Sequence, residues 1–387
     1  MAGRGRTVAF FVWRVGASFP STRAVLPMKI EDYFSSNYTE ARSRFLRLCR
    51  DNGFGITSYQ NEAAQAPDGS DLVMDVATLG RTDAENLLVL SSGTHGVEGY
   101  CGSGIQSALV GESRLLPGDN LRIALVHAVN PFGFAHDRRV NEDNIDLNRN
   151  FLEFGKVVPS DNGYGDIHAW LVPEDWQGEA RAEADRQLAR YAAENGAMAL
   201  QAAASGGQYT HPGGLFYGGK EPSWSARTIL SIVGDLAASA RRANFIDFHT
   251  GLGPYGHGEI INVGSAAQVE RGFAFYPEFE LTDPDAGTSS SAPVQGTLAH
   301  GVERALPNVQ TVFIALEYGT QPMREVMTAL RADNWLYQNA AVDSHLGKEI
   351  KQQVRNAFYC DEPEWKELIW KRAVEVVDAT CLKLNAT

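Results

Sequence analysis

The sequence predicts an α/β fold in which a central mixed, largely parallel sheet is flanked by helices. Three apolar runs carry this prediction, and each has the length and composition of a buried strand: Leu87–Leu90, Leu121–Val129 and Ala243–His249. Segments with helical spacing lie between these runs. Because strands and helices alternate along the chain, we expect helices to cover the faces of the sheet.

Further elements follow from the same patterns. An amphipathic pattern from Asp32 to Cys49, stopped by Gly53, predicts a helix. Leu72–Val76 and Thr311–Glu317 read as strands. The remaining predicted helices are Ile105–Val110, about Glu174–Ala204, a segment ending near Arg241, about Pro322–Leu346 and about Glu362–Leu382.

Composition narrows the class of protein. The chain has 387 residues, of which 44% are hydrophobic, and this length suffices for a sizeable core. Its 34 Lys+Arg against 47 Asp+Glu give a net charge of −13, which disfavours nucleic acid or an anionic membrane as a partner. The four cysteines lack CxxC spacing, which favours a reducing, cytoplasmic location. Cys101 is interpreted as a buried thiol.

The chain is expected to hold a single domain that begins near Met28. Residues 1–27 carry four arginines and no acidic residue, and their apolar stretch is too short to span a membrane. We expect this segment to be a disordered or non-native extension, with an organellar transit peptide or a secretory signal as alternatives. Within residues 28–387, the region of about 155–214 is predicted to be an insertion. Nothing in the sequence indicates the oligomeric state.

A small-residue loop follows the strand at Leu87–Leu90 and carries His95 and Glu98. A His and a carboxylate three residues apart at the end of a strand can reach one metal ion from the same side. A pair of this kind arises often by chance, so the later strands decide its meaning.

Two later strands end in the same way. Ala243–His249 ends on His249, and Thr311–Glu317 ends on Glu317. Open α/β sheets place their ligands at the carboxyl ends of strands, so we expect these side chains to meet. Two His and one carboxylate form a catalytic zinc set that leaves a fourth position for water, and His95, Glu98 and His249 supply it. Glu317 is then available as a general base.

Polar density marks the segment from Asn130 to Phe151. Arg138, Arg139, Asn148 and Arg149 lie in this loop, which follows a strand. Arginine offers a planar two-point grip on a carboxylate, so the loop suits a carboxylate-binding site. A second loop, from Thr210 to Ser225, is rich in Gly and aromatic residues. It is interpreted as a substrate wall or lid, with Tyr217 and His211 as candidates, although ordinary turn chemistry explains its glycines as well.

With His95-x-x-Glu98, Asp146-Leu-Asn-Arg-Asn-Phe, His249 and Glu317 in this order, the chain resembles the zinc carboxypeptidase superfamily. Within it the chain most resembles the branch of aspartoacylase and succinylglutamate desuccinylase, and related bacterial proteins of unassigned function. The resemblance spans about Leu87 to Gly319.

The resemblance implies one zinc per chain on His95, Glu98 and His249, with Glu317 activating a water. It implies that Asn148 and Arg149 hold a substrate carboxylate. Arg139, or with less support Arg138, corresponds to the arginine that polarises the scissile carbonyl. The superfamily's substrate-contacting tyrosine has three possible counterparts, of which Tyr217 is our choice and Tyr255 and Tyr318 are the others.

The expected activity is hydrolysis of an amide bond next to a carboxylate, by an N-acyl amino acid deacylase or a carboxypeptidase. The substrate is then a small molecule or a peptide. An alternative is a catalytically inactive metal- or ligand-binding protein of the same fold. A serine hydrolase is disfavoured, because Cys101 and Ile105 flank Ser103 where a G-x-S-x-G turn needs glycines.

Overall fold

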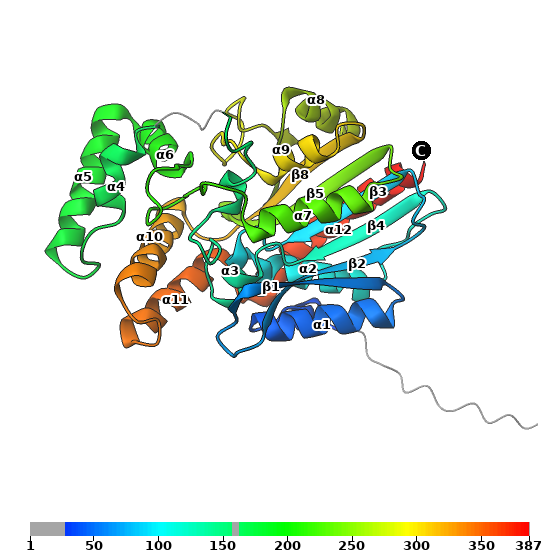
Figure 1. Ribbon diagram of the computed structural model, residues 1–387, viewed down its shortest axis with the longest axis horizontal. Coiled ribbons are helices and arrows are strands. Elements are labelled where there is room, and N and C mark those ends of the chain that lie inside the picture. Colours follow the sequence, from blue (N-terminus) through cyan, green and yellow to red (C-terminus); the bar gives the residue numbers. More distant parts are fainter. Residues whose placement is uncertain (1–27, 157–161, 387) are drawn as a thin grey trace, which may run out of the picture.

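The structure is a computed structural model that describes residues 28–156 and 162–386. Within these residues an eight-stranded sheet forms the centre of the protein, in the order β1-β2-β4-β3-β5-β8-β6-β7 (Figure 1). The strands are β1 (Gly55–Gln65), β2 (Asp71–Leu79), β3 (Asn86–Ser92), β4 (Leu121–His127), β5 (Arg242–Tyr255), β6 (Gly258–Asn262), β7 (Leu281–Thr282) and β8 (Gln310–Gly319). Residues 1–27, for which we predict an extension, lie outside the described residues.

The sheet is mixed, and its central strands are parallel. β3 pairs in parallel with β4 and β5, and β5 pairs in parallel with β8. Antiparallel pairing joins β2 to β1 and β4 on one side and β6 to β8 on the other. All seven residues of β3 are buried, as expected for a parallel strand covered on both faces. The predicted fold class is confirmed.

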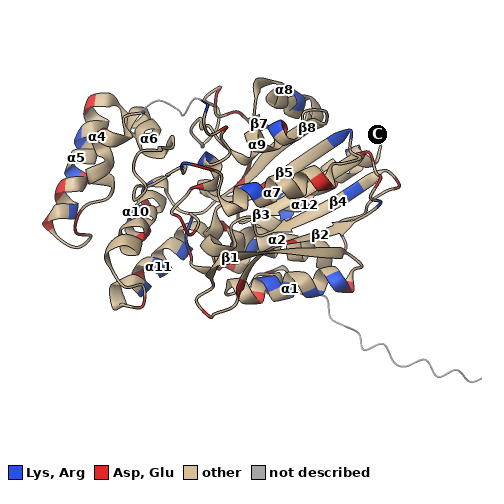
Figure 2. Cartoon of the chain, in the orientation of Figure 1, with Lys and Arg blue, Asp and Glu red and all other residues tan. Residues whose placement is uncertain are grey.

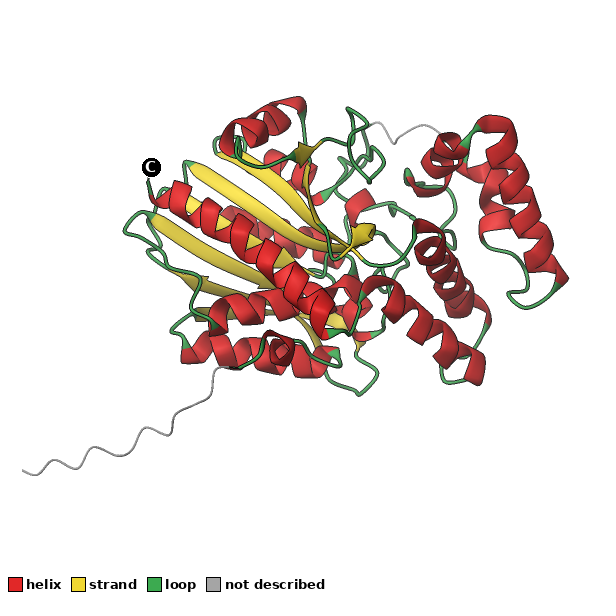
Figure 3. Ribbon diagram, turned by 180° about the vertical axis from the view of Figure 1, so that it is seen from behind, coloured by secondary structure: helices red, strands yellow, loops and turns green. Residues whose placement is uncertain are grey.

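Helices cover both faces of the sheet. Successive side chains of a strand point to opposite faces, and those of β3 join two hydrophobic clusters. Leu88 and Leu90 pack in the cluster that contains residues of α1, α2 and α12, whereas Leu87 and Val89 pack in the cluster of α7 and α9. Both signs of charge lie on outer helices such as α1 and α5, while the strands are mostly uncharged (Figure 2). Figure 3 shows α12 crossing the face opposite to α7.

The helices are α1 (Tyr38–Asp51), α2 (Gly99–Gly111), α3 (Pro131–Ala135), α4 (Tyr164–Leu171), α5 (Glu179–Asn195), α6 (Ala197–Ser205), α7 (Trp224–Leu236), α8 (Ala266–Phe275), α9 (Leu298–Ala305), α10 (Met323–Asn339), α11 (His345–Phe358) and α12 (Pro363–Asn385). Helices α4, α5, α6, α10 and α11 lie beyond one end of the sheet (Figures 1 and 3). None of the described helices is long and apolar enough to span a membrane.

Several boundaries differ from the prediction. The segment about Glu174–Ala204 forms two helices, because Gly196 adopts a left-handed backbone conformation with φ of 93° between α5 and α6. The segment about Pro322–Leu346 is also divided, and Ser344 caps the second helix. Strands β1 and β6 and helices α8 and α9 were not predicted. β1 is a largely exposed strand at the edge of the sheet, so it has no apolar run to reveal it.

Helix α2 begins six residues before the predicted Ile105. Its first turns have the sequence GYCGSG, which reads as a loop, yet every residue from Gly99 to Val110 is buried. A Cβ on Gly102 would lie 2.6 Å from the Cβ of Ser92 in β3. The glycines therefore permit close packing of α2 on the sheet.

The loop between β3 and α2 packs equally closely on α3. A Cβ on Gly96 would lie 2.1 Å from the carbonyl carbon of Gly133. The Gly96 amide donates to the Arg139 carbonyl at 3.0 Å, and the Val97 amide donates to that of Arg138 at 2.8 Å. The backbone between His95 and Glu98 is thus fixed by the segment 133–139.

We predict that Gly96→Ala lowers the free energy of unfolding by about 1–3 kcal/mol, because the added methyl group overlaps backbone atoms that cannot yield without moving α3. Denaturant unfolding measures this change. Gly234→Ala is the matched control, since Gly234 lies exposed within α7 with no atom near its Cβ position. Alanine there should stabilise the protein by about 0.5–1 kcal/mol. A Gly96→Ala protein as stable as the control would contradict the close packing.

Candidate metal and active site

Three side chains of the predicted metal set meet in the structure. His95 follows β3 and precedes the short 3-10 helix Gly96–Glu98, while His249 lies within β5, the parallel neighbour of β3. One ligand atom from each of His95, Glu98 and His249 lies within 4.8 Å of the others. All three residues are buried. The parallel pairing of β3 and β5 therefore brings together residues that are about 150 positions apart in the sequence.

The carboxylate of Glu98 joins the two imidazole rings. Its Oε1 lies 2.9 Å from Nδ1 of His95, and its Oε2 lies 2.8 Å from Nδ1 of His249. The two Nδ1 atoms are 3.2 Å apart. Two imidazole nitrogens and a carboxylate oxygen that converge in this way form a donor set that suits zinc.

Asp247 orients His249 from behind. Its Oδ2 lies 2.7 Å from Nε2 of His249, and its Oδ1 accepts hydrogen bonds from Ser91 and Thr94 at 2.7 and 3.0 Å. Burial alone would lower the pKa of His249, but Asp247 and Glu98 hold that pKa well above its usual value. Because Asp247 holds Nε2, Nδ1 of His249 is directed at the cluster. In many metal sites a carboxylate that is not itself a ligand orients a histidine ligand in the same way.

Sequence reasoning did not single out Asp247. It stands two residues before His249, so both side chains leave β5 on the same face. The two-residue spacing between Asp247 and His249 in a predicted strand could therefore have identified Asp247 from the sequence.

Glu317 lies on β8, in register with His249 across the parallel pair of β5 and β8. The backbone amide of Leu252 donates to its Oε1 at 2.9 Å. Burial, together with the negative charge of Glu98, raises the pKa of Glu317 to about 8. A divalent cation beside it would lower this pKa again. His249 and Glu317 lie inside their strands, since β5 and β8 continue beyond the expected ends to Tyr255 and Gly319.

The structure distinguishes the two candidate arginines. Nε of Arg139 donates to Asp146 at 2.9 Å, Nη1 donates to Glu98 at 3.2 Å, and Nη2 lies 2.7 Å from Nε2 of His95. Arg138 points elsewhere, where it donates to Asp333 at 2.9 Å and is 1% exposed. Arg139 is therefore the arginine at the cluster.

Arg149 is buried beside the cluster, but its guanidinium has mostly neutral partners. Nη1 and Nη2 donate to the backbone carbonyls of Asn148 and Ser205 at 3.0 and 2.5 Å, and Nε has no partner among the described residues. Its Nη1 lies 4.0 Å from Oδ1 of Asp146. The side-chain oxygen of Asn148 accepts from the amide of Leu298 at 3.0 Å. Asn148 and Arg149 thus both line the same cavity as the cluster.

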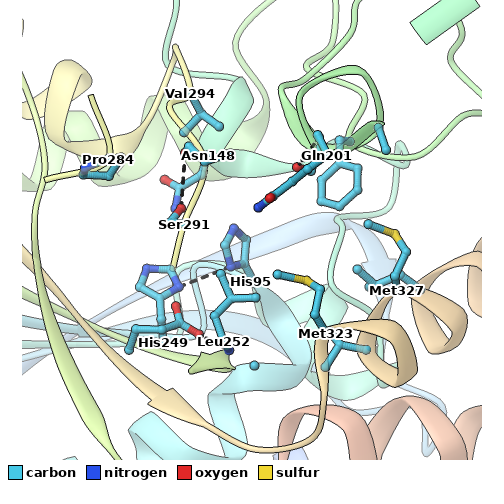
Figure 4. Close-up of a pocket in the computed structure, with 18 of the residues that line it drawn as sticks. His95, Asn148, Gln201, His249, Leu252, Pro284, Ser291, Val294, Met323 and Met327 are labelled. Carbon is cyan, nitrogen blue, oxygen red and sulfur yellow. Dashed lines mark hydrogen bonds between the residues drawn. The ribbon is translucent and has the colours of Figure 1, made fainter. Parts of the chain in front are cut away.

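That cavity has a volume of about 800 Å³. Figure 4 shows His95 and His249 on one wall, with Met323 and Met327 of α10 and Gln201 of α6 facing the same space. Volumes of this size hold ligands of several tens of atoms. Glu98, Arg139 and Glu317 also line it.

Tyr217 requires a correction. The loop from Thr210 to Ser225 does contribute a wall of the cavity, but through Phe216. Tyr217 points the other way, into the hydrophobic cluster under α7 and α9, and is not among the described residues that line the cavity. Neither are His211, Tyr255 and Tyr318. Phe216 lies in a turn with a φ of 51°, so the chain changes direction between these two neighbours and their side chains face opposite sides.

Ser103 also lies away from the cavity. Its hydroxyl is 2.8 Å from Nε2 of His127, and both side chains are buried in the core. Burial lowers the pKa of His127 to about 4. The pair packs under α1, where Phe45 stacks on His127, and does not reach a substrate-sized space.

The charge balance around the cluster is consistent with a bound cation. Six charged side chains surround it, four of them carboxylates and two guanidinium groups. They are Glu98, Asp146, Asp247, Glu317, Arg139 and Arg149. The carboxylates outnumber the guanidinium groups by two, and this difference can be balanced by protons on His249 and Glu317, whose pKa values are raised, or by a single divalent ion in their place.

The fold and this site together define an α/β protein with a buried His-Glu-His cluster that opens into a cavity. Its chain matches, over residues 34–372, the family described as a protein of unknown function, DUF2817, and belongs to that family. No curated protein matches the sequence.

The fold is similar to those of several solved structures, including the following three proteins. Carboxypeptidase A from Helicoverpa armigera has 11% identity and a TM-score of 0.43, with 89% of this chain and 75% of that chain covered. An aspartoacylase family protein from Mesorhizobium loti has 15% identity and a TM-score of 0.35, with 73% and 66% covered. A metallo-carboxypeptidase from Burkholderia cenocepacia has 15% identity and a TM-score of 0.35, with 88% and 70% covered. At these values the similarities define no activity for this chain.

We predict that Asp247→Asn weakens zinc binding by about 10- to 100-fold, because the amide cannot replace the charged hydrogen bond that orients His249. Competition with a chromophoric chelator measures the affinity. Asp235→Asn, at an exposed position of α7, is the control and should bind zinc as the unchanged protein does. Equal affinities for the two variants would show that Asp247 does not orient the ligand.

Proposed function

We propose that the protein is a zinc-dependent hydrolase of an amide bond next to a carboxylate, acting as an N-acyl amino acid deacylase or a carboxypeptidase. One observation carries the proposal: Nδ1 of His95, Nδ1 of His249 and the Glu98 carboxylate converge at a cavity that Glu317 also lines. The cluster supplies three ligands, and the carboxyl group of Glu317 is left for proton transfer.

His95, Glu98 and His249 would hold one zinc ion per chain. The donor set fits a divalent ion, and so does the excess of carboxylates over guanidinium groups around it. Bound there, zinc would supply Lewis acidity toward water and toward an amide carbonyl.

Glu317 is the proposed general base. Its position on β8 beside His249 is fixed by the sheet, and the Leu252 amide holds one of its carboxyl oxygens, which leaves the other for a water. Glu317 takes a proton from the attacking water and delivers it to the nitrogen of the leaving amine. A cation beside Glu317 would lower its raised pKa again, which would leave the carboxylate ionised and able to accept the proton of the water.

Arg149 is the proposed reader of the substrate carboxylate, with Asn148 beside it. Its guanidinium is buried against neutral carbonyl groups, and its Nε lacks a partner among the described residues. The carboxylate of Asp146 lies 4.0 Å from Arg149, whereas it accepts a hydrogen bond from Arg139 at 2.9 Å. A carboxylate from a substrate would supply the missing negative charge and would accept from the second N–H of a terminal nitrogen.

Arg139 is proposed to stabilise the oxyanion that develops on the scissile carbonyl. In the structure it contacts Asp146, Glu98 and His95. Each terminal nitrogen of a guanidinium carries two N–H groups, so a second donor remains on each for the substrate. The same contacts hold Arg139 still, which is the condition for electrostatic stabilisation of a transition state.

The first test is zinc analysis of the purified protein, followed by a screen of N-acyl amino acids against short peptides with free C-termini. We expect one zinc per chain and hydrolysis within one of the two sets. His95→Ala and His249→Ala should each release most of the metal. Full zinc in both variants would refute the site, and a zinc-loaded protein that hydrolyses no amide would support the alternative of an inactive metal-binding protein.

Glu317→Gln separates metal binding from proton transfer. The amide keeps the shape of the side chain but cannot take a proton, so kcat should fall by about 10² to 10⁴ while the zinc content persists. Steady-state kinetics and metal analysis on the same preparation provide both numbers. Turnover close to that of the unchanged enzyme would show that another group performs the proton transfer.

Arg149→Lys tests the carboxylate reader. An ammonium group cannot reproduce the planar two-point contact, and loss of a charged hydrogen bond costs about 1.5–3 kcal/mol, so kcat/KM should fall roughly ten- to a hundredfold. Arg227→Lys, exposed on α7, is the control.

The same role can be tested on the substrate. An analogue whose carboxylate is amidated should be a poor substrate of the unchanged enzyme, by a similar factor. The Arg149→Lys variant should barely distinguish the two compounds. If the unchanged enzyme hydrolyses both equally well, Arg149 does not read a carboxylate.

A further inference from the structure

One part of the cavity is lined by large apolar side chains that the proposed chemistry does not use. These residues come from α6, from α10, from the turn that carries Phe216 and from the end of β5, which carries Leu252. We call them the apolar chamber, and they are Leu200, Phe216, Leu252, Met323, Met327 and Leu330.

We propose that the apolar chamber binds a long apolar acyl chain, so that the substrate class is an N-acyl amino acid with a medium or long hydrocarbon acyl group. The inference rests on the proposed amide hydrolysis, which it makes specific. A hydrocarbon chain needs no polar partner and gains from burial in proportion to its length.

The chamber lies across the metal cluster from Asn148. In Figure 4, Asn148 and Met327 lie on opposite sides of His95, with Met323 and Leu252 next to the cluster. A substrate whose carboxylate end lies toward Asn148 would therefore place the group on the other side of its amide bond toward Met327. That group is the acyl group.

The backbone of Phe216 provides a second, independent observation that supports a binding site here. Its φ is 51°, in the left-handed region that a bulky side chain rarely occupies, and such strain persists only where the surroundings impose it. The ring is 6% exposed and lies 5.4 Å from the guanidinium carbon of Arg139 and 5.6 Å from that of Arg149. The strained residue thus forms the border between the charged site and the chamber.

Two arginines near the chamber, Arg181 and Arg331, are paired with Asp185. Arg331 donates to Asp185 at 2.7 Å and to the carbonyls of Leu171 and Trp170 at 3.0 and 2.8 Å. Arg181 lies 3.7 Å from Asp185 and stacks on Trp176. These groups do not require a charged ligand, so the chamber presents its apolar surface to the substrate.

Two methionines facing the chamber also suit chains of varying length. A thioether side chain is unbranched and adapts its rotamers to irregular apolar ligands. Met327 is half-buried and packs against the core, whereas Met323 is 43% exposed at the start of α10. The wall of the chamber is therefore packed against the core at Met327, whereas the side chain of Met323 at its edge is free to change rotamer.

The test is a series of N-acylglycines with acyl groups of two to fourteen carbons. We expect kcat/KM to rise by up to about fourfold for each methylene that enters the chamber, and then to level off. Met327→Gln and Leu200→Gln, which keep the size of the side chain but add an amide, should flatten this dependence. Met198→Gln is the matched control, because Met198 is also on α6 but is 71% exposed and does not line the cavity.

A second series varies the amino acid at a fixed acyl group. In this series kcat/KM should depend less on the apolar size of the amino acid side chain than it depends on the length of the acyl chain in the first series. A dependence confined to the amino acid would place the apolar group on the wrong side of the amide bond and overturn the inference, as would a flat acyl series or equal slopes for Met327→Gln and Met198→Gln.

Binding separates this inference from the proposed function. Calorimetry of N-acylglycines with the Glu317→Gln protein should give affinities that rise with chain length and that fall in a Glu317→Gln, Met327→Gln double variant. Chain-dependent binding without hydrolysis by the unchanged enzyme would refute the hydrolase but support the chamber. Hydrolysis that is indifferent to chain length, with binding equally indifferent, would refute the chamber and leave the hydrolase standing.

Discussion

The rest of the site depends on the burial of four carboxylates close together. Glu98, Asp146, Asp247 and Glu317 are all buried, and an unpaired charge in such a place is strongly unfavourable. Partners come from every neighbouring segment: Arg139 from the loop after α3, imidazoles from the end of β3 and from β5, and hydroxyl groups from β3 and the loop after it. The charges tie segments together that the hydrophobic core alone would leave free to shift, so the chemistry and the local fold share the same contacts.

Much of the arrangement could be predicted because it depends on strands. Apolar runs identify β3, β5 and β8, and parallel pairing then places His95, His249 and Glu317 at one end of the sheet. Asp247 was missed because a carboxylate within an apolar run has no motif of its own, although its spacing from His249 fixes a common face. Local pattern was sufficient wherever the periodicity of a strand determined the answer.

The remaining errors concern loops and long-range packing. Tyr217 and Phe216 are neighbours, and only the path of the chain through the bridge with Ile145 decides which one faces the cavity. The choice between Arg138 and Arg139 depends on Asp333, nearly 200 residues away in the sequence. Glycines read as a loop in α2 serve close packing instead. None of these outcomes is encoded within a short window.

His249 and Glu317 lie on strands, and His95 and Glu98 lie in the short segment directly after β3, whereas the chamber is formed mostly by helices and loops at the end of the sheet. A strand residue is held by hydrogen bonds to both neighbours, so the reacting groups have little freedom to drift as the sequence around them changes. The helices α5 and α6 lie outside the sheet, and the hydrogen bonds that Asp185 and Ser205 accept come from Arg331 of α10 and from Arg149, not from strands. The protein can therefore change what it accepts by altering the helices beyond the sheet while its reactive centre stays as it is. Proteins of this architecture that accept different substrates should accordingly differ in the helices between the Asn148 loop and β5, and not in the sheet.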